Sequence, residues 1–189
     1  MATLPFFLYQ THHQKLTLFL EQLSLWNKNT DLVGNSTIDD SWNRHIMNSL
    51  QFLAYLGQHD KVILDIGTGA GLPGLVCALC DPERTYILYE KKYQKRVFLK
   101  HIISLFKMDN VIIRENFIPE QCPKADILTS RALLGVQDIQ PCLKAVKKIV
   151  LFKGRHYEQE INNLKTPQEA FKIEVCQAYM DDSVFVICS

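Results

Sequence analysis

Residues 62–74 read VILDIGTGAGLPG, a short apolar strand followed by a glycine-rich turn. Glycines between a strand and a helix let the backbone turn sharply and approach a ligand closely, because no Cβ stands in the way. Pro73 suits the first turn of a helix, which we predict to run through Leu79. Glu90 follows the next predicted strand, 85–89, where its carboxylate can accept hydrogen bonds from both hydroxyls of a ribose. The pattern predicts a nucleoside site at the end of the first strand.

Two kinds of nucleoside cofactor compete for this turn. A dinucleotide fingerprint, GxGxxG, counted from Gly67 puts Leu72 where a small residue should pack helix against strand. Counted from Gly69 the fingerprint fits, but it starts late and puts Pro73, which has no N–H, inside the phosphate-binding turn. The alternative, Asp-x-Gly-x-Gly-x-Gly over 65–71, suits S-adenosylmethionine, which has no pyrophosphate and needs an acidic group near its ammonium. The turn therefore favours S-adenosylmethionine.

Around this turn the chain alternates predicted strands and helices. The strands are 62–66, 85–89, 111–113, 125–128 and 149–152, the helices 73–79, 94–106, 138–144 and 158–164, and a terminal hairpin pairs 171–176 with 184–188. Right-handed βαβ units give a mainly parallel, helix-covered sheet. The closing antiparallel hairpin is what methyltransferase sheets add and dinucleotide-binding sheets lack. We predict an α/β, Rossmann-like class I methyltransferase fold with a seven-stranded sheet.

The first sixty residues are predicted to be helical. One apolar face recurs at helical spacing, at Leu16, Phe19, Leu20, Leu23 and Trp26, and a break is predicted over 27–35. Ser36 or Thr37 can cap a second helix, with Asp39 and Asp40 in its first turn and a buried stripe of Trp42, Ile46, Leu50 and Leu53. We expect 1–60 to be a helical extension packed on the cofactor-binding domain 61–189, the two forming one structural unit.

Composition excludes several classes of protein. The 189 residues are 47% hydrophobic with a net charge of +1, which suits one compact domain and does not by itself indicate a nucleic-acid binder. No signal peptide or membrane span is predicted. The six cysteines are scattered as in reduced cytosolic proteins, and Cys77-x-x-Cys80 has no second ligand pair, so these two are read as small buried hydrophobes. We expect a cytoplasmic protein without a metal.

Several short strings converge on one family. They are LWNK at 25–28, WNRHIMNSL at 42–50, LDIGTGAGLPG at 64–74, KRVFL at 95–99, TSRA at 129–132 and FKG at 152–154. In this order and at about this spacing they resemble the RsmG (GidB) family, over roughly 26–154. The resemblance implies a cytoplasmic enzyme that uses S-adenosylmethionine to methylate N7 of one guanine in small-subunit (16S) ribosomal RNA, near the decoding region. We expect it to act as a monomer.

The resemblance also implies which residues bind the cofactor. Glu90 would hold the ribose, Arg131 would lie beside the methionine end, and the loop at Phe117 and Ile118 would flank the adenine. The full predicted set is Asp65, Gly67, Thr68, Gly69, Gly71, Leu72, Glu90, Phe117, Ile118 and Arg131. The chain departs from the family at 117–119, where Phe-Ile-Pro replaces the common Arg-Ala-Glu and removes a polar contact to the adenine.

The expected reaction needs no general base, because guanine N7 offers a lone pair and loses no proton. We therefore predict no catalytic acid or base, and catalysis by positioning alone, which can supply up to about 7–11 kcal/mol. A bidentate arginine on guanine O6 and N7 would occupy the reacting lone pair. Arg131 and Lys153 are expected to hold phosphate, the cofactor carboxylate or O6 alone.

RNA contacts are predicted from two basic clusters, expected to flank the carboxyl ends of the same sheet. The first comprises Lys91, Lys92, Lys95, Arg96 and Lys100, and the second Lys144, Lys147, Lys148, Lys153, Arg155 and His156. The predicted contact set is Arg44, His45, Lys95, Arg96, Arg131, Lys153 and Arg155. For each cluster, a solvated helix face is the competing interpretation. The modest charge suggests an assembling 30S particle as substrate rather than free RNA.

Other functions stay open from the sequence alone. A small-molecule methyltransferase would show no salt-dependent affinity for RNA. A ribosome-binding module without catalysis finds its support in the altered loop at 117–119. An oxidoreductase using a nicotinamide cofactor is disfavoured by Leu72 and by the late start of the fingerprint.

Overall fold

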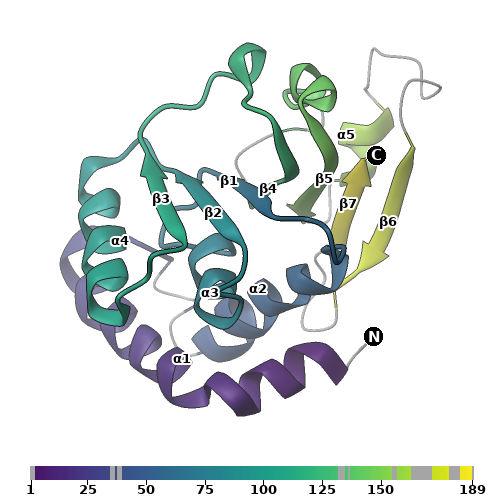
Figure 1. Cartoon of the computed structure of the whole chain (residues 1–189). Helices are drawn as coiled ribbons and strands as arrows, with labels where there is room; N and C mark the ends of the chain where they lie inside the picture. The colour runs from purple at the N-terminus through teal and green to yellow at the C-terminus, as the bar shows by residue number, and fades with distance from the viewer. Residues whose placement is uncertain are drawn as a thin grey trace.

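The computed structural model describes residues 3–34, 37, 40–131, 135, 137–154, 157–162, 172–178 and 184–188. Its centre is a seven-stranded sheet of order β3-β2-β1-β4-β5-β7-β6 (Figure 1). The strands are β1 Val62–Ile66, β2 Thr85–Tyr89, β3 Val111–Arg114, β4 Ala125–Arg131, β5 Val146–Lys153, β6 Ile173–Gln177 and β7 Val184–Cys188. Strands β1 to β5 are parallel, and β7 runs antiparallel to both β5 and β6. The predicted mainly parallel sheet with a terminal antiparallel hairpin is confirmed.

Successive strand residues face opposite sides of the sheet and build two separate hydrophobic clusters. Ile63, Ile127 and Val150 join the cluster formed with helices α1 to α4. Their neighbours Leu64 and Leu128 join the second cluster, which includes residues of η5 and α5. Figure 1 shows the same arrangement, with α1 to α4 gathered on one side of the sheet and α5 on the other. The molecule is therefore a three-layer sandwich.

The helical elements surround this sheet. They are α1 Thr3–Thr30, η2 Trp42–Met47, α2 Asn48–Gln51, η3 Phe52–Tyr55, α3 Gly74–Cys80, α4 Tyr93–Phe106, η4 Pro119–Gln121, η5 Gln140–Lys144 and α5 Tyr157–Asn162. The helix predicted over 138–144 is a shorter 3₁₀ helix, η5. The predicted ends at Leu164 and Phe171 lie outside the described residues, as do Ser36 and Asp39. None of the described helices is long and apolar enough to cross a membrane.

The first predicted helix does not break at Asn27. The helix continues to Thr30, and the Asn27 side-chain oxygen accepts hydrogen bonds from the backbone N–H groups of Leu32 (2.7 Å) and Val33 (2.8 Å). Asparagine is a common breaker because its side chain competes for backbone groups. Here it satisfies the N–H groups of the turn that follows the helix, so the break comes three residues later.

The second predicted helix is divided into three short pieces. A π-helix, η2, is followed by one α-helical turn, α2, and a 3₁₀ turn, η3. The predicted stripe is still inward, since Ile46 and Leu50 are fully buried and Leu53 nearly so. Leu16 and Phe19 of α1 belong to the same cluster as these residues and the sheet. The N-terminal helices therefore share the core of the sheet.

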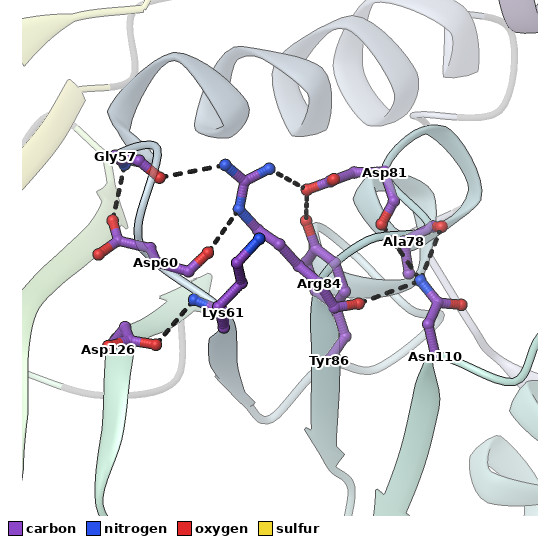
Figure 2. Close-up of polar contacts among 9 residues, drawn as sticks. All are labelled: Gly57, Asp60, Lys61, Ala78, Asp81, Arg84, Tyr86, Asn110 and Asp126. Atoms are coloured by element: carbon purple, nitrogen blue, oxygen red, sulfur yellow. Dashed lines mark hydrogen bonds and ion pairs between the residues drawn. The ribbon is translucent and has the colours of Figure 1, made fainter.

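The amino-terminal edge of the sheet is closed by side-chain hydrogen bonds (Figure 2). Arg84 donates to the Asp81 carboxylate at 2.7 Å and to two carbonyl oxygens of the loop 57–60. The side-chain amide of Asn110 donates to the carbonyl oxygens of Ala78, Asp81 and Arg84 at 3.2–3.3 Å. These contacts join the loops that precede β1, β2 and β3. The candidate site lies at the opposite, carboxyl-terminal edge.

Candidate cofactor and substrate site

The turn after β1 needs its glycines. Gly67, Gly69 and Gly71 have φ of 71°, 61° and 88°, the left-handed region that other residues rarely adopt. The backbone N–H groups of Gly67 and Thr68 both donate to the carbonyl oxygen of Tyr89, at 2.8 and 3.1 Å. The turn is thereby fixed against the end of β2, with its backbone open to a ligand.

Asp65 is a fully buried carboxylate with one oxygen unused. Its Oδ2 accepts hydrogen bonds from the Thr68 hydroxyl at 2.6 Å and from the Gly74 N–H at 2.8 Å. Its Oδ1 is buried and has no hydrogen-bond partner among the described residues. Burial raises the pKa of Asp65 to about 6, against the opposing effects of these bonds and of Arg131. An ammonium group of a ligand would supply the missing partner, and this fits the predicted cofactor.

Glu90 is held at the end of β2 by backbone donors. Its Oε2 accepts from the Gly69 N–H at 2.9 Å and its Oε1 from the Lys92 N–H at 2.7 Å, and the residue is only 7% exposed. Each carboxylate oxygen has a second lone pair, so two ribose hydroxyls can still donate to it. The sequence indicated the position of Glu90 but gave no sign that it also fixes the glycine turn.

Arg96 positions the loop after β2, contrary to the prediction that it contacts RNA. Its Nη1 donates to the carbonyl oxygens of Glu90 (3.0 Å) and Lys91 (2.6 Å), and its Nη2 pairs with Glu115 at 3.2 Å. Its guanidinium also lies 5.8 Å from the ring centroid of Tyr93. The side chain is 13% exposed. Because these donors serve the chain itself, we do not retain Arg96 as an RNA contact.

A cavity of about 260 Å³ opens beside the glycine turn. It is lined by Ile66, Gly67, Tyr89, Lys91, Glu115, Asn116, Phe117 and Pro119. The Phe117 ring packs edge-on against Tyr89, with centroids 5.1 Å apart, so the cavity has aromatic walls suited to a flat base. Ile118, predicted to flank the adenine, is 48% exposed and does not line this cavity. Pro119 lines it instead.

Lys95, predicted to contact RNA, lies beside the glycine turn. Its Nζ donates to the carbonyl oxygen of Leu32 at 3.3 Å. The same nitrogen is 3.9 Å from the position that a Cβ on Gly69 would take. Lys95 therefore joins the segment after α1 to the turn that would hold the cofactor.

His45 is buried and belongs to the packing of the N-terminal helices. The Thr37 hydroxyl donates to the Gly34 carbonyl at 2.6 Å, so it accepts from His45 Nε2 at 3.0 Å. Burial first, and then the charge of Arg131, lower the pKa of His45 to about 4, which keeps it neutral. At 4% exposure His45 is packed among these helices, and its contact with RNA stays a prediction.

Arg131 ends β4 beside these N-terminal helices. Its Nη1 donates to the carbonyl oxygen of Arg44 at 3.3 Å, and its charge acts on both Asp65 and His45. Arg44 itself is exposed. The structure thus brings Arg131 to the edge that carries Asp65, as the sequence predicted, and adds a contact with the N-terminal extension.

The second basic cluster does not gather at one edge. Lys153 is 7% exposed and its Nζ pairs with Glu160 at 2.7 Å, so it is not available to RNA. Three lysines lie before or at the start of β5, at the amino-terminal edge, namely Lys144, Lys147 and Lys148. The rest of β5 separates them from the carboxyl edge, and sequence proximity could not reveal this. Arg155 and His156 lie outside the described residues.

The Cys77-x-x-Cys80 motif belongs to the core of the protein. Cys77 and Cys80 are buried in the main hydrophobic cluster, which confirms their interpretation as small core residues. Among the described residues, no group of three or more His, Cys, Asp or Glu side chains is placed to hold a metal ion.

Solved structures share this architecture. An rRNA methylase from Streptococcus thermophilus superposes with a TM-score of 0.54 at 11% identity, covering 74% of this chain and 92% of that one. A SAM-dependent O-methyltransferase from Thermotoga maritima gives a TM-score of 0.57 at 18% identity, covering 73% and 63%. At these identities the likeness concerns the fold, and it confirms the class I methyltransferase fold predicted from the sequence.

The sequence relatives of this chain carry the same protein name. The ribosomal RNA small subunit methyltransferase G of Magnetococcus marinus is 34% identical over 170 residues, 85% of this chain and 77% of the relative. The protein of that name from Rickettsia rickettsii is 34% identical over 155 residues, 80% of each chain. A family model described as GidB, rRNA small subunit methyltransferase G, matches residues 12–180. The chain therefore belongs to the GidB family, as the short motifs had indicated.

Proposed function

We propose that this protein transfers the methyl group of S-adenosylmethionine to N7 of one guanine in 16S ribosomal RNA, near the decoding region. Family membership supports the cofactor and the small-subunit RNA substrate. The observation that carries the proposal is the unpaired, fully buried Oδ1 of Asp65 beside a left-handed glycine turn. A buried carboxylate oxygen without a donor is rare in folded proteins and calls for a cationic ligand group.

The proposed cofactor position follows the carboxyl edge from β1 to β3. Asp65 accepts from the methionine ammonium, and the backbone at Gly67 and Gly69 lets the ligand come close. Glu90 accepts from the ribose, and the base enters the cavity next to Phe117. When bound, S-adenosylmethionine supplies an electrophilic methyl group on a sulfonium. Leu72 is buried, so we propose that it supports the turn from the side of the hydrophobic core.

Positioning carries the proposed chemistry. Guanine N7 needs no deprotonation, so the protein has to place the base in line with the methyl group. Positive charge moves from sulfur onto the purine during transfer. Because His45 is neutral, it adds no further positive charge near Arg131. We propose that Arg131 contacts phosphate, O6 or the cofactor carboxylate through single hydrogen bonds.

We propose that RNA lies across the exposed basic residues of this edge. Arg44, Lys91 and Lys92 are exposed, and Tyr93 beside them is 69% exposed. The extension 1–60 and the domain 61–189 act as one unit in this proposal, because Arg44 and Leu32 of the extension contact Arg131 and Lys95. We further propose a cytoplasmic monomer that modifies the assembling 30S particle.

The decisive experiment is methyl transfer from labelled S-adenosylmethionine to 16S RNA and to 30S particles from cells lacking this gene. Chemical cleavage at 7-methylguanine locates the product. One labelled guanine near the decoding region is the expected result, with particles preferred over naked RNA. Cofactor binding without labelled RNA would refute the proposed substrate and favour a small-molecule methyltransferase. Absence of cofactor binding would instead indicate a binding module.

Glu90→Ala is expected to weaken cofactor binding by about 5- to 150-fold, or 1–3 kcal/mol, since two ribose hydrogen bonds and the anchor of Gly69 are lost. Isothermal titration calorimetry measures the change. Glu158→Ala, on α5, is the matched control and should bind normally. If Glu90→Ala binds the cofactor as tightly as the unaltered protein, the ribose does not lie at Glu90.

Arg131→Ala is expected to lower kcat at saturating cofactor by at least about tenfold, because a positioning contact at the reacting edge is removed. Single-turnover methylation and thermal unfolding are measured on the same preparation. Lys144→Ala, at the far edge of the sheet, should leave kcat unchanged. A fall in unfolding temperature that accounts for the lost activity would make Arg131 a structural residue.

A further inference from the structure

Two cysteines from different elements meet at one carbonyl oxygen. Cys122 directly follows η4, and its backbone N–H donates to the carbonyl oxygen of Pro119 at 3.1 Å. Cys142 lies in η5, and its thiol approaches the same oxygen at 3.7 Å. The Cys122 thiol itself donates to the carbonyl oxygen of Pro123 at 3.6 Å, and the two side chains act on each other's pKa. This pair could not be predicted from the sequence, because β4 separates the two residues along the chain.

The surroundings of the two thiols are unequal. Cys142 is fully buried in the second hydrophobic cluster, whereas Cys122 is half-buried at its margin. The side chain of Cys142 lowers the pKa of the Cys122 thiol. The side chain of Cys122, followed by burial, raises the pKa of the Cys142 thiol. Cys122 is thus the more accessible and more readily ionised sulfur, with Cys142 directly behind it.

The other cysteines lack this arrangement. Cys77 and Cys80 are buried in the opposite hydrophobic cluster, and burial raises the pKa of both thiols. Cys188 is buried in β7, and burial also raises the pKa of its thiol. Cys176 is half-buried on the edge strand β6. It serves as a natural comparison for simple accessibility.

We propose that Cys122 and Cys142 form a dithiol site that a hydroperoxide oxidises to an intramolecular disulfide. The Cys122 thiolate attacks one oxygen of the hydroperoxide, which gives a sulfenic acid and releases an alcohol, or water when the oxidant is hydrogen peroxide. The Cys142 sulfur then attacks the sulfenic sulfur, the S–S bond forms, and water leaves. The two thiols lose two electrons, which reduce the O–O bond.

This site adjoins the cofactor cavity. Pro119 lines the cavity, and the disulfide removes the thiol hydrogen that Cys142 directs at the Pro119 carbonyl. It also ties η5 to the turn that carries Phe117. Oxidation is therefore expected to weaken binding of S-adenosylmethionine by at least about threefold, and by linkage bound cofactor opposes oxidation to the same extent. This last step rests on the proposed function, whereas formation of the disulfide does not.

The test is peptide mapping of the whole protein after treatment with hydrogen peroxide and alkylation of free thiols. Trypsin places Cys122 in the peptide 115–124 and Cys142 in 132–144, so the disulfide appears as one cross-linked species lighter by two hydrogen atoms. The expected result is this cross-link, reversed by dithiothreitol, with Cys176 still alkylated. Cross-links among other cysteines, or Cys122 oxidised to sulfinic acid without a cross-link, would overturn the proposal.

Variants separate the two roles. Cys142→Ser should accumulate a sulfenic acid on Cys122, trapped by dimedone, because no resolving sulfur remains. Cys122→Ser should leave Cys142 reduced, since that thiol is buried. Cys176→Ser is the matched control and should form the cross-link at the normal rate. Equal sulfenic acid yields at positions 122 and 142 in the two serine variants would contradict the assigned order. Thermal unfolding of each reduced variant establishes that it is folded.

Discussion

Asp65→Asn is expected to stabilise the ligand-free protein at pH 7 and to weaken cofactor binding strongly. The pKa of Asp65 is raised by burial to about 6, above its ordinary 3.8. A raised carboxyl pKa contributes stability that is complete below pH 4 and is lost as the pH rises through 6. At pH 7 the difference between the two pKa values lowers the free energy of unfolding by about 3 kcal/mol. Asparagine avoids this loss because it does not ionise. Loss of the anion facing the ammonium should weaken binding by roughly 100-fold.

Urea unfolding of both proteins between pH 4 and pH 7 measures the first effect, and calorimetry with S-adenosylmethionine the second. The advantage of Asp65→Asn in unfolding free energy should grow between pH 4 and pH 7. Asp126→Asn is the opposite control, because a hydrogen bond with Lys147 lowers the pKa of Asp126 to about 2. Because this pKa lies below the measured range, that variant should be less stable than the unaltered protein throughout pH 4 to pH 7. A lower stability of Asp65→Asn at pH 7 would show that the buried charge of Asp65 does not destabilise the ligand-free protein.

Gly74→Ala should strongly destabilise the protein. A Cβ at this position would lie 2.6 Å from Asp65 Oδ2 and 2.6 Å from Leu88 Cδ2, both of them in the packed interior. Neither neighbour can move freely, because Asp65 is held by Thr68 and by the Gly74 N–H. Overpacking of this kind costs about 3 kcal/mol, which is roughly 6–12 °C in the unfolding temperature of a chain of this size.

Thermal unfolding and cofactor titration of Gly74→Ala provide the measurement. Gly34→Ala is the matched control, since nothing lies within 4 Å of the added methyl group. We expect the control to unfold at the temperature of the unaltered protein and to bind the cofactor equally well. Equal unfolding temperatures for the two alanine variants would mean that α3 can shift away from β1 without loss.

The strands could be predicted where an apolar run is bounded by turn residues. The bounds of β1, β2 and β7 match the sequence prediction to the residue, because each run ends at polar residues or at glycine. Strand β5 begins earlier than predicted, at Val146, because Lys147 and Lys148 interrupt its apolar pattern. Lys147 pairs with Asp126 and Lys148 donates to Tyr55, so tertiary contacts make these lysines acceptable in a strand.

The candidate site could be predicted in part. Asp65, Glu90 and Arg131 were placed at one edge from the turn and from the family motifs, and the structure brings them there. Their contacts could not be predicted from the sequence, because hydrogen bonds such as that from the Gly69 N–H to Glu90 depend on how two loops meet. The same limit explains Arg96 and Lys153, whose charges suggested RNA while their surroundings turn them inward. A sequence shows charge, but burial of that charge is decided by packing.

The network in Figure 2 has a consequence for how sequences of this family can change in length. Asn110 donates to one carbonyl oxygen in the last turns of α3 and to two in the connection from α3 to β2, and Arg84 donates to the segment that leads into β1. An inserted residue in either connection would break several of these bonds at once. Insertions and deletions among relatives should therefore be rare between 78 and 85, and should concentrate in connections that no such network spans.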